Sequence, residues 1–294
     1  MKANILRIWS FVLAIIVIQV MVEPSSAETF SVDSGFIEVN GGSIFYEAAG
    51  NGPAVIMIHD GILHRETWNA QFTLFAGSYR VIRWDRRGYG RSDSPNAPFS
   101  NLDDLLTLMD ALKVERATLM GCSSGGLLAI DFTLEHPERV SSLILVGPII
   151  SGFGFSRHFN TRGDRGMPRA DAPVDEKITY WVRKDPWITA PESQAAKDKM
   201  GKLLTANPQN LGGSGRYARG PGRSAMALLS EIKAPTLILA GESDIPDVHA
   251  HIGVIQAGIA GSQRVVLPHS GHLAHFEVPE EFNRVVLDFL KTTE

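Results

Sequence analysis

Short apolar runs alternate with amphipathic stretches along most of the chain. The runs Ala54–His59 and Thr236–Ala240 are almost wholly apolar, which is typical of parallel strands that helices cover on both faces. Trp68, Phe72 and Phe75 recur at helical spacing and predict one face of an amphipathic helix. This alternation predicts a doubly wound, mostly parallel α/β sheet. Further strands are expected at Ile44–Ala48, Val81–Asp85, Ala117–Cys122, Leu143–Val146 and Arg264–Leu267, and helices at Arg65–Phe75, Leu102–Lys113 with Asn101 as its cap, Gly125–Glu135, Val248–Ala260 and Pro279–Lys291.

Residues 151–230 interrupt this alternation. They are rich in Gly, Pro and Arg, and helical patterns occur only near Val174–Val182 and Glu192–Leu204. They carry 13 Lys and Arg against 7 Asp and Glu, a net charge of +6, whereas the whole chain has −4. We therefore expect a mainly helical lid over 151–230, inserted into an α/β core made of 28–150 and 231–294. Its closely spaced arginines either form a solvated surface or face the site entrance, where they would attract substrates with a carboxylate: Arg157, Arg162, Arg165 and Arg169.

Residues 1–27 have the pattern of a secretory signal peptide. Lys2 and Arg7 precede an apolar run from Ile8 to Val22, and small residues occupy positions 25–27 before a cleavage site. We expect an exported protein, periplasmic or secreted, with no stable membrane span after cleavage. An uncleaved N-terminal membrane anchor is the alternative, because the apolar run is only just shorter than a span of about 20 residues.

Composition and charge exclude several other classes of protein. A chain of 294 residues that is 44% hydrophobic and 20% charged has the composition of a globular protein with a full core. A pI near 6.1 argues against a nucleic-acid partner, which requires a strongly basic face. The single cysteine, Cys122, cannot form an internal disulfide, and no Cys/His cluster predicts a metal. No metal or cofactor is therefore expected, and the oligomeric state stays open.

A candidate nucleophile lies in the segment Gly121-Cys122-Ser123-Ser124-Gly125. This G-x-S-x-G pattern falls where a predicted strand ends and a predicted helix begins, so a sharp turn would hold the Ser123 hydroxyl clear of the sheet. The start of the helix would offer free N–H groups to a developing oxyanion. A serine hydroxyl is a weak nucleophile, so the pattern also predicts a histidine base and an orienting carboxylate elsewhere in the chain.

Of the nine histidines, His272 is the preferred base. It lies in the loop after the last predicted strand, from which a side chain can reach over the carboxyl edge of the sheet. His269 lies nearer the strand end, and His275 begins the approach to the last helix; both remain alternatives.

Asp244 is the preferred carboxylate, because it lies one turn past the end of the predicted strand Thr236–Ala240. Asp247 and Glu242 are the alternatives. Ser123, Asp244 and His272 then occur in the order Ser, Asp, His, which is the order of one fold in particular.

Over residues 35–292 the chain resembles the α/β-hydrolase superfamily. Beside the features above, Ile58–Gly61 looks like the oxyanion-loop segment of that family, Asp85–Ser92 looks like its Asp-x-Arg-Gly-x-Gly-x-Ser loop, and 271–280 resembles its last loop and final helix start. Asp60 departs from the pattern, since the family usually has Gly there. The resemblance implies an oxyanion hole made by the N–H groups of Gly61 and Ser124. We assign Asp85–Ser92 a structural role only, because its glycines predict a tight turn and its Arg and Asp side chains can tie neighbouring loops together.

A serine nucleophile disfavours those branches of the superfamily that attack with a carboxylate. Hydrolysis of a small carboxylic ester or lactone through a Ser-His-Asp triad and an acyl-enzyme is the leading interpretation. Carbon–carbon bond hydrolysis by the same triad is an alternative, and a non-catalytic small-ligand receptor of the same fold is another. In each case the partner is a small molecule.

Overall fold

The computed structural model describes residues 30–162 and 166–293, so the predicted signal segment 1–27 lies outside the described residues. One mixed sheet runs through the described residues, and its two antiparallel pairs, β1 with β2 and β2 with β4, both involve β2. The other pairs are parallel, which confirms the doubly wound, mostly parallel sheet. Its spatial order is β1 (Asp33–Val39), β2 (Gly42–Ala49), β4 (Arg80–Trp84), β3 (Ala54–Ile58), β6 (Ala117–Cys122), β7 (Val140–Val146), β9 (Thr236–Gly241) and β10 (Gln263–Leu267).

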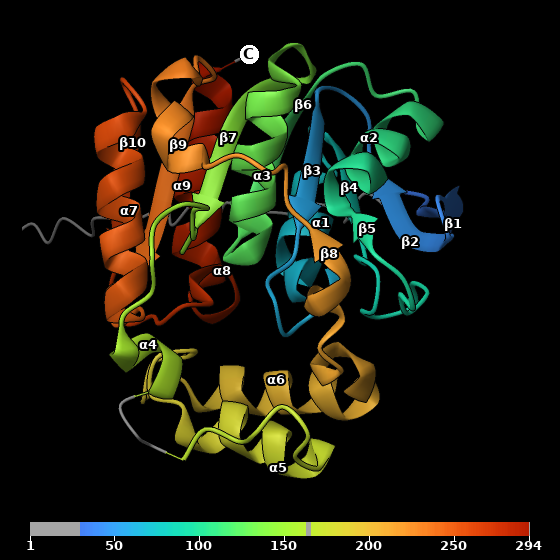
Figure 1. Cartoon of the computed structure of the whole chain (residues 1–294). Helices are drawn as coiled ribbons and strands as arrows, with labels where there is room; N and C mark the ends of the chain where they lie inside the picture. Colours follow the sequence, from blue (N-terminus) through green and yellow to red (C-terminus); the bar gives the residue numbers. More distant parts are fainter. Residues whose placement is uncertain (1–29, 163–165, 294) are drawn as a thin grey trace, which may run out of the picture.

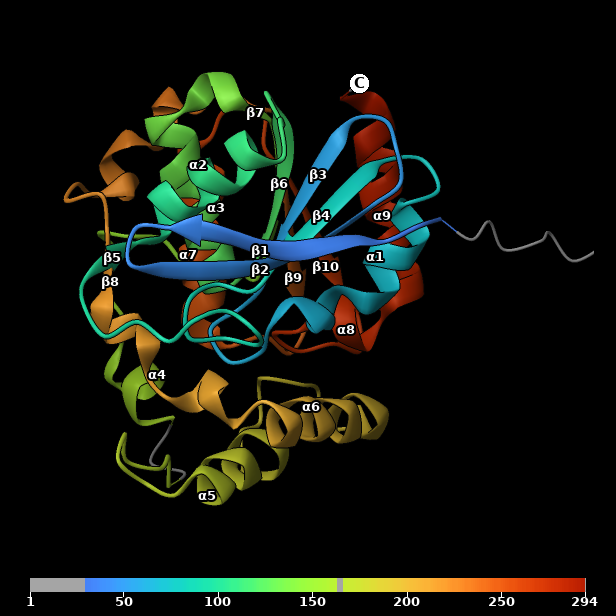
Figure 2. The same ribbon diagram turned by 90° about the vertical axis from the view of Figure 1, so that its right-hand side faces the viewer.

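Helices cover both faces of this sheet (Figure 2). Successive strand residues point to opposite faces: in β3, Ile56 and Ile58 pack in the core on one face, and Val55 and Met57 in the core on the other. The first face is covered by α2 (Asn101–Ala111), α3 (Ser124–Glu135) and α7 (Pro246–Gly258), and the second by η1 (Arg65–Trp68), α1 (Asn69–Phe75), α8 (Ala274–Glu277) and α9 (Pro279–Thr292); a short turn, η2 (Pro137–Arg139), precedes β7.

The structure differs locally from the sequence expectations: one strand was missed and one predicted helix cap was wrong. The edge strand β1 was not predicted, because most of its residues are exposed and it has no apolar run. The cap of α2 is Ser100 and not Asn101: the Ser100 hydroxyl accepts a hydrogen bond from the Asp103 N–H at 3.1 Å.

The segment 151–230 leaves the sheet after β7 and returns to it at β9. Its helices α4 (Arg157–Thr161), α5 (Val174–Thr179) and α6 (Gln194–Ala206) lie together beside one end of the sheet (Figure 1). Ile188, Met200 and Leu204 are buried in the same core as α1 and α9, so the segment packs firmly on the rest of the chain. Its elements are α4 (Arg157–Thr161), α5 (Val174–Thr179), the π-helical η3 (Tyr180–Lys184), α6 (Gln194–Ala206), η4 (Pro208–Leu211), η5 (Ser214–Tyr217), β8 (Ala218–Arg219), which pairs with β5 (Phe99–Ser100), and η6 (Ala225–Glu231).

The order of the strands defines where a ligand can bind. The strand β3 pairs with β4 on one side and with β6 on the other, so the chain reverses its direction of winding at β3. In open α/β sheets, ligands bind beyond the carboxyl ends of the strands at such a switch point. Residues 59–63 follow β3 and Ser123 follows β6, which places both at this position. Within the described residues, no helix is long and apolar enough to cross a membrane.

Candidate active site

Ser123 lies in a strained turn between β6 and α3. Its φ of 55° and ψ of −116° are rare for a residue with a side chain. The flanking glycines permit this turn: a Cβ on Gly121 would lie 2.3 Å from the Gly125 carbonyl oxygen, and one on Gly125 would lie 2.4 Å from that of Ile58. The Ser123 N–H donates to Val146 O at 2.8 Å. These constraints hold the Ser123 side chain at the pocket that it lines.

His272 and Asp244 are brought together by two loops that follow neighbouring strands. The His272 Nδ1–H donates to Asp244 Oδ1 at 2.8 Å, and the same oxygen accepts the Ile245 N–H at 2.6 Å. Because the carboxylate can only accept, Nδ1 carries the proton and Nε2 is left as the acceptor. The His272 N–H donates to Trp187 O at 2.8 Å, so the inserted segment also fixes this loop.

The pKa of His272 reflects opposing effects. Complete burial lowers it, whereas the charge of Asp244, the hydrogen bond to Asp244 and the charge of Asp60 raise it. The charge of Arg162 also lowers the pKa. The net pKa lies above the usual 6.5, because a carboxylate in a low-dielectric site stabilises the imidazolium.

The alternative histidines have other contacts. His269 is exposed, and its Nδ1 lies 3.7 Å from Glu192 Oε1. His275 is buried against Trp68, and its Nε2 forms a hydrogen bond of 3.0 Å with the Thr67 hydroxyl. Of these three histidines, His272 is the one that lines the pocket with Ser123.

The alternative carboxylates also lie elsewhere. Asp247 accepts the Ser156 N–H at 2.6 Å and its hydroxyl at 2.8 Å, and so anchors the start of α4. Glu242 is exposed and accepts the His269 N–H at 3.4 Å. The described contacts therefore join His272 to Asp244 and to neither alternative.

The loop after β3 is closed by the carboxylate of Asp60. Its Oδ1 accepts the N–H groups of Ile62 at 2.7 Å and Leu63 at 2.9 Å. The residue that departs from the family pattern thus makes the turn that presents Gly61 to the pocket. Gly61 and Ser124 are adjacent, since a Cβ on Gly61 would lie 3.4 Å from the Ser124 hydroxyl.

Arg86 joins Ser124 to the peptide group between Asp60 and Gly61, a connection that the sequence did not predict. Its Nη2 donates to the Asp60 carbonyl and, at 2.9 Å, to the Ser124 hydroxyl. His59 supports it by accepting the Arg86 N–H at 3.0 Å and donating from Nδ1 to the Asp60 carbonyl at 2.7 Å. In a planar trans peptide the N–H points opposite to the C=O. Fixing the Asp60 carbonyl therefore fixes the direction of the Gly61 N–H.

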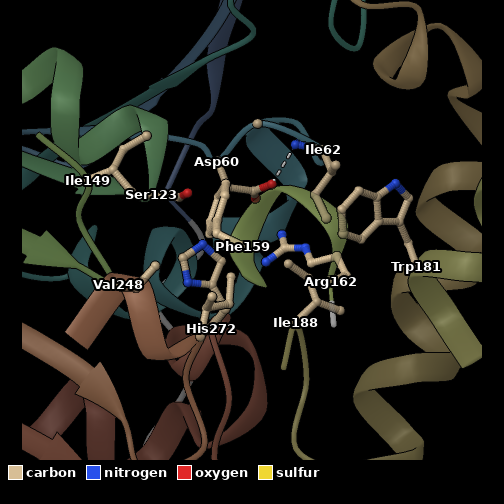
Figure 3. A pocket seen from close by; sticks show the side chains of 12 residues that line it. Asp60, Ile62, Ser123, Ile149, Phe159, Arg162, Trp181, Ile188, Val248 and His272 are labelled. Carbon is tan, nitrogen blue, oxygen red and sulfur yellow. Dashed lines mark hydrogen bonds between the residues drawn. The ribbon is translucent and has the colours of Figure 1, made fainter. Parts of the chain in front are cut away.

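The pocket between the sheet and the inserted segment is mainly apolar (Figure 3). Its space amounts to about 490 Å³ including the open mouth, a size suited to a small molecule. Cys122 is buried beneath the site, where burial raises its thiol pKa well above the usual value, so it is unsuited to nucleophilic chemistry. Among the described residues, no group of three His, Cys, Asp or Glu could hold a metal ion. The lining residues are Asp60, Gly61, Ile62, Ser123, Ile149, Phe159, Arg162, Trp181, Ile188, Ile245, Val248 and His272.

The chain belongs to the α/β hydrolase fold family, whose pattern it matches over residues 53–279. Two curated relatives are similar over nearly their whole length. One, from Comamonas testosteroni, is a 2-hydroxy-6-oxo-6-phenylhexa-2,4-dienoate hydrolase, 31% identical over 84% of this chain and 91% of its own. The other, from Paraburkholderia xenovorans, is a 2-hydroxy-6-oxononadienedioate/2-hydroxy-6-oxononatrienedioate hydrolase, 30% identical over 90% and 98%.

Solved structures extend this comparison. An N-acyl homoserine lactone degrading enzyme superposes with a TM-score of 0.71 at 26% identity, covering 87% of this chain and 100% of that one. A hydrolase from Pseudomonas aeruginosa superposes with a TM-score of 0.72 at 28% identity, over 88% and 98%. Relatives of this chain are thus hydrolases of several bond types, and the chain is a hydrolase of this fold.

Proposed function

We propose that the protein hydrolyses a carboxylic ester or lactone of a small molecule, with Ser123 as nucleophile, His272 as base and Asp244 as its orienter. The observation that carries this proposal is the shared pocket of Ser123, held on its strained turn, and His272, bonded to Asp244. A hydroxyl beside an oriented neutral imidazole is the arrangement that acyl transfer requires.

In this mechanism His272 Nε2 takes the proton of the Ser123 hydroxyl as its oxygen attacks the substrate carbonyl carbon. The N–H groups of Gly61 and Ser124 stabilise the oxyanion, and collapse of the tetrahedral intermediate breaks the bond to the alcohol oxygen. His272 returns the proton to the leaving alcohol, which leaves an acyl-enzyme. Water then attacks with His272 as base, and Ser123 and a carboxylic acid are released.

The test uses 4-nitrophenyl esters of increasing acyl length and a set of lactones. We expect turnover by the wild type and loss of at least about 10³-fold in kcat for Ser123→Ala, with residual catalysis from the oxyanion donors. A fluorophosphonate should label Ser123 and no other serine, as read by peptide mass spectrometry. Wild-type activity retained in Ser123→Ala would refute the nucleophile assignment, and ligand binding without turnover would favour a receptor.

Carbon–carbon bond hydrolysis is a second candidate, and the two dienoate hydrolases among the relatives favour it. The same triad residues would then promote cleavage of a carbon–carbon bond next to a carbonyl group. A 2-hydroxy-6-oxo-dienoate in the substrate panel separates the two, because its strong absorbance is lost on cleavage. A kcat/KM for this compound far above that for every ester and lactone would replace the ester proposal.

We also propose that residues 1–27 direct export and are then removed. The mature chain should begin near Glu28, which intact-mass measurement of protein from the native host tests. A chain that still begins at Met1 and is recovered with membranes would instead mean an uncleaved anchor.

A further inference from the structure

The pocket contains a cation that the mechanism does not use. Arg162 is only 6% exposed, and Figure 3 shows its guanidinium pointing into the pocket that Ser123 and His272 line. A guanidinium is charged at any physiological pH, so its burial requires an anionic or hydrogen-bonding partner.

The protein provides only part of that partner. Arg162 Nε lies 3.4 Å from Asp185 Oδ2 in an ion pair, but the two atoms do not form a hydrogen bond of acceptable geometry. Neither Nε nor Nη1 has a hydrogen-bond acceptor among the described residues. The other oxygen of Asp185 is occupied by the N–H groups of Trp187 and Ile188, at 3.0 and 2.9 Å. Asp185 therefore restrains the guanidinium without satisfying its donors.

The position of Arg162 is held by its surroundings. Its guanidinium carbon lies 4.6 Å from the ring centre of Phe159 and 5.5 Å from that of Trp181. Its backbone, at the end of α4, has φ 51° and ψ 38°, a left-handed conformation uncommon for a residue with a side chain. An arginine that is stacked, ion-paired and strained, yet unsatisfied, has the character of a prepared binding group.

Other arginines of the inserted segment do not share this environment. Arg157 and Arg169 are exposed, and Arg169 is paired with Asp171 at 3.0 Å. Arg165 lies outside the described residues. Of Arg157, Arg162 and Arg169, only Arg162 lines the pocket that contains Ser123.

We propose that Arg162 binds a carboxylate of the substrate, remote from the bond that Ser123 attacks, so that the enzyme prefers anionic acyl compounds. This rests on the proposed function. Asp60 also lines the pocket, and its Oδ2 is buried without a hydrogen-bond partner among the described residues. The carboxylate of Asp60 would repel the carboxylate of the substrate, so the substrate carboxylate lies beside Arg162 and away from Asp60. Asp60 is then free to accept a hydrogen bond from a hydroxyl of the same substrate.

The test compares mono-4-nitrophenyl glutarate with its neutral methyl ester, which has the same leaving group. The quantity measured is the ratio of kcat/KM for the anionic substrate to that for the neutral one. Arg162→Met should lower this ratio about 10- to 100-fold, because a charge-assisted hydrogen bond is lost. Arg162→Lys retains the charge but not the planar guanidinium, so its ratio should lie between those of the wild type and Arg162→Met. Arg157→Met, the same substitution on an exposed position of α4, should leave the ratio unchanged.

A binding measurement separates this proposal from the proposed function. Glutarate should bind to the Ser123→Ala protein in calorimetry, and the added substitution Arg162→Met should weaken that binding about 10-fold or more. If the wild type hydrolyses esters but Arg162→Met leaves both the ratio and glutarate binding unchanged, the carboxylate site is refuted and ester hydrolysis stands. If no ester is hydrolysed while glutarate binding still depends on Arg162, the site stands and the ester proposal fails.

Discussion

Replacing Arg86 by Met should slow the chemical step while leaving substrate binding nearly unchanged. Arg86 does not itself line the pocket, and no described hydrogen bond joins it to His272 or Asp244; it holds the Asp60 carbonyl and the Ser124 hydroxyl. The variant removes both hydrogen bonds and keeps the volume of the side chain roughly constant. The Gly61 and Ser124 N–H groups would then point less well at the oxyanion, which is absent from the bound substrate and develops in the transition state that leads to the tetrahedral intermediate.

The size of the effect follows from what remains. Loss of a whole oxyanion donor typically costs about 10²–10³ in kcat. In Arg86→Met both donors persist, His59 still donates to the Asp60 carbonyl, and the Tyr89 hydroxyl still donates to the Gly61 carbonyl at 2.9 Å. We therefore expect a smaller loss of about 10- to 100-fold in kcat, which corresponds to about 1.4–2.7 kcal/mol. Tyr89→Phe removes only the hydrogen bond to the Gly61 carbonyl, so its loss in kcat should be smaller than that of Arg86→Met.

A neighbouring arginine supplies the matched control. Arg87 is equally buried and comes from the same loop, but it pairs with Asp104 through two hydrogen bonds of 2.7 and 2.8 Å. Arg87→Met leaves Asp104 buried and unpaired. The free energy of unfolding of Arg87→Met should therefore fall at least as much as that of Arg86→Met. Both variants are assayed at a temperature where circular dichroism shows them folded, with kcat and KM determined separately. Equal kcat losses in the two variants, or a raised KM with unchanged kcat in Arg86→Met, would refute the positioning role.

Three further predictions concern the triad. Asp244→Asn should lower kcat by up to about 10⁴-fold, because the amide favours the wrong tautomer of His272, whereas Asp247→Asn should change kcat little; the reverse ranking would mean that the wrong carboxylate was named. In pH profiles of kcat/KM the acid limb should have its midpoint above pH 6.5, the usual pKa of histidine, because the pKa of His272 is raised. Asp60→Asn removes a charge that favours the imidazolium, so it should shift the acid limb to lower pH, and a shift to higher pH would contradict this reasoning. Gly147→Ala should cost about 10- to 100-fold in kcat, since its Cβ would lie 2.9 Å from both Asp244 Oδ2 and His272 Nδ1 at a φ of +49°; unchanged kinetics would show that the pair adapts freely.

The parts of the protein that the sequence predicted are those fixed by local backbone demands. The turn around Ser123 needs Gly121 and Gly125, because a Cβ at either position would lie within 2.4 Å of a backbone oxygen. The five-residue G-x-S-x-G pattern is therefore enough to predict the nucleophile. Parallel strands with helices on both faces are mostly apolar, and Thr236 is the one polar residue in β3 and β9. The fold followed from these two signals, and Asp244 and His272 were preferred because each follows a strand end.

The features that were missed depend on contacts between distant residues. Arg86 and Ser124 are 38 positions apart, and nothing near either residue indicates that they form a hydrogen bond. In the Asp-x-Arg-Gly-x-Gly-x-Ser pattern of Asp85–Ser92, Arg87 is the fixed arginine and Arg86 occupies a variable position, so the pattern did not single out Arg86. In the same way, Arg162 was one of four arginines with equal claims in the sequence, and only its burial beside Phe159 and Trp181 separated it from the exposed ones.

Asp60 shows why a departure from a family pattern need not disrupt a site. Its carboxylate closes the turn through Ile62 and Leu63, and its carbonyl is the atom that Arg86 and His59 hold. The same carboxylate helps to raise the pKa of His272 across the pocket. A glycine in this position would retain the carbonyl contact but lose both the turn and the charge. The sequence showed Asp60 only as a departure from the family pattern, whereas the contacts make it the residue that both shapes the oxyanion loop and adds charge to the pocket.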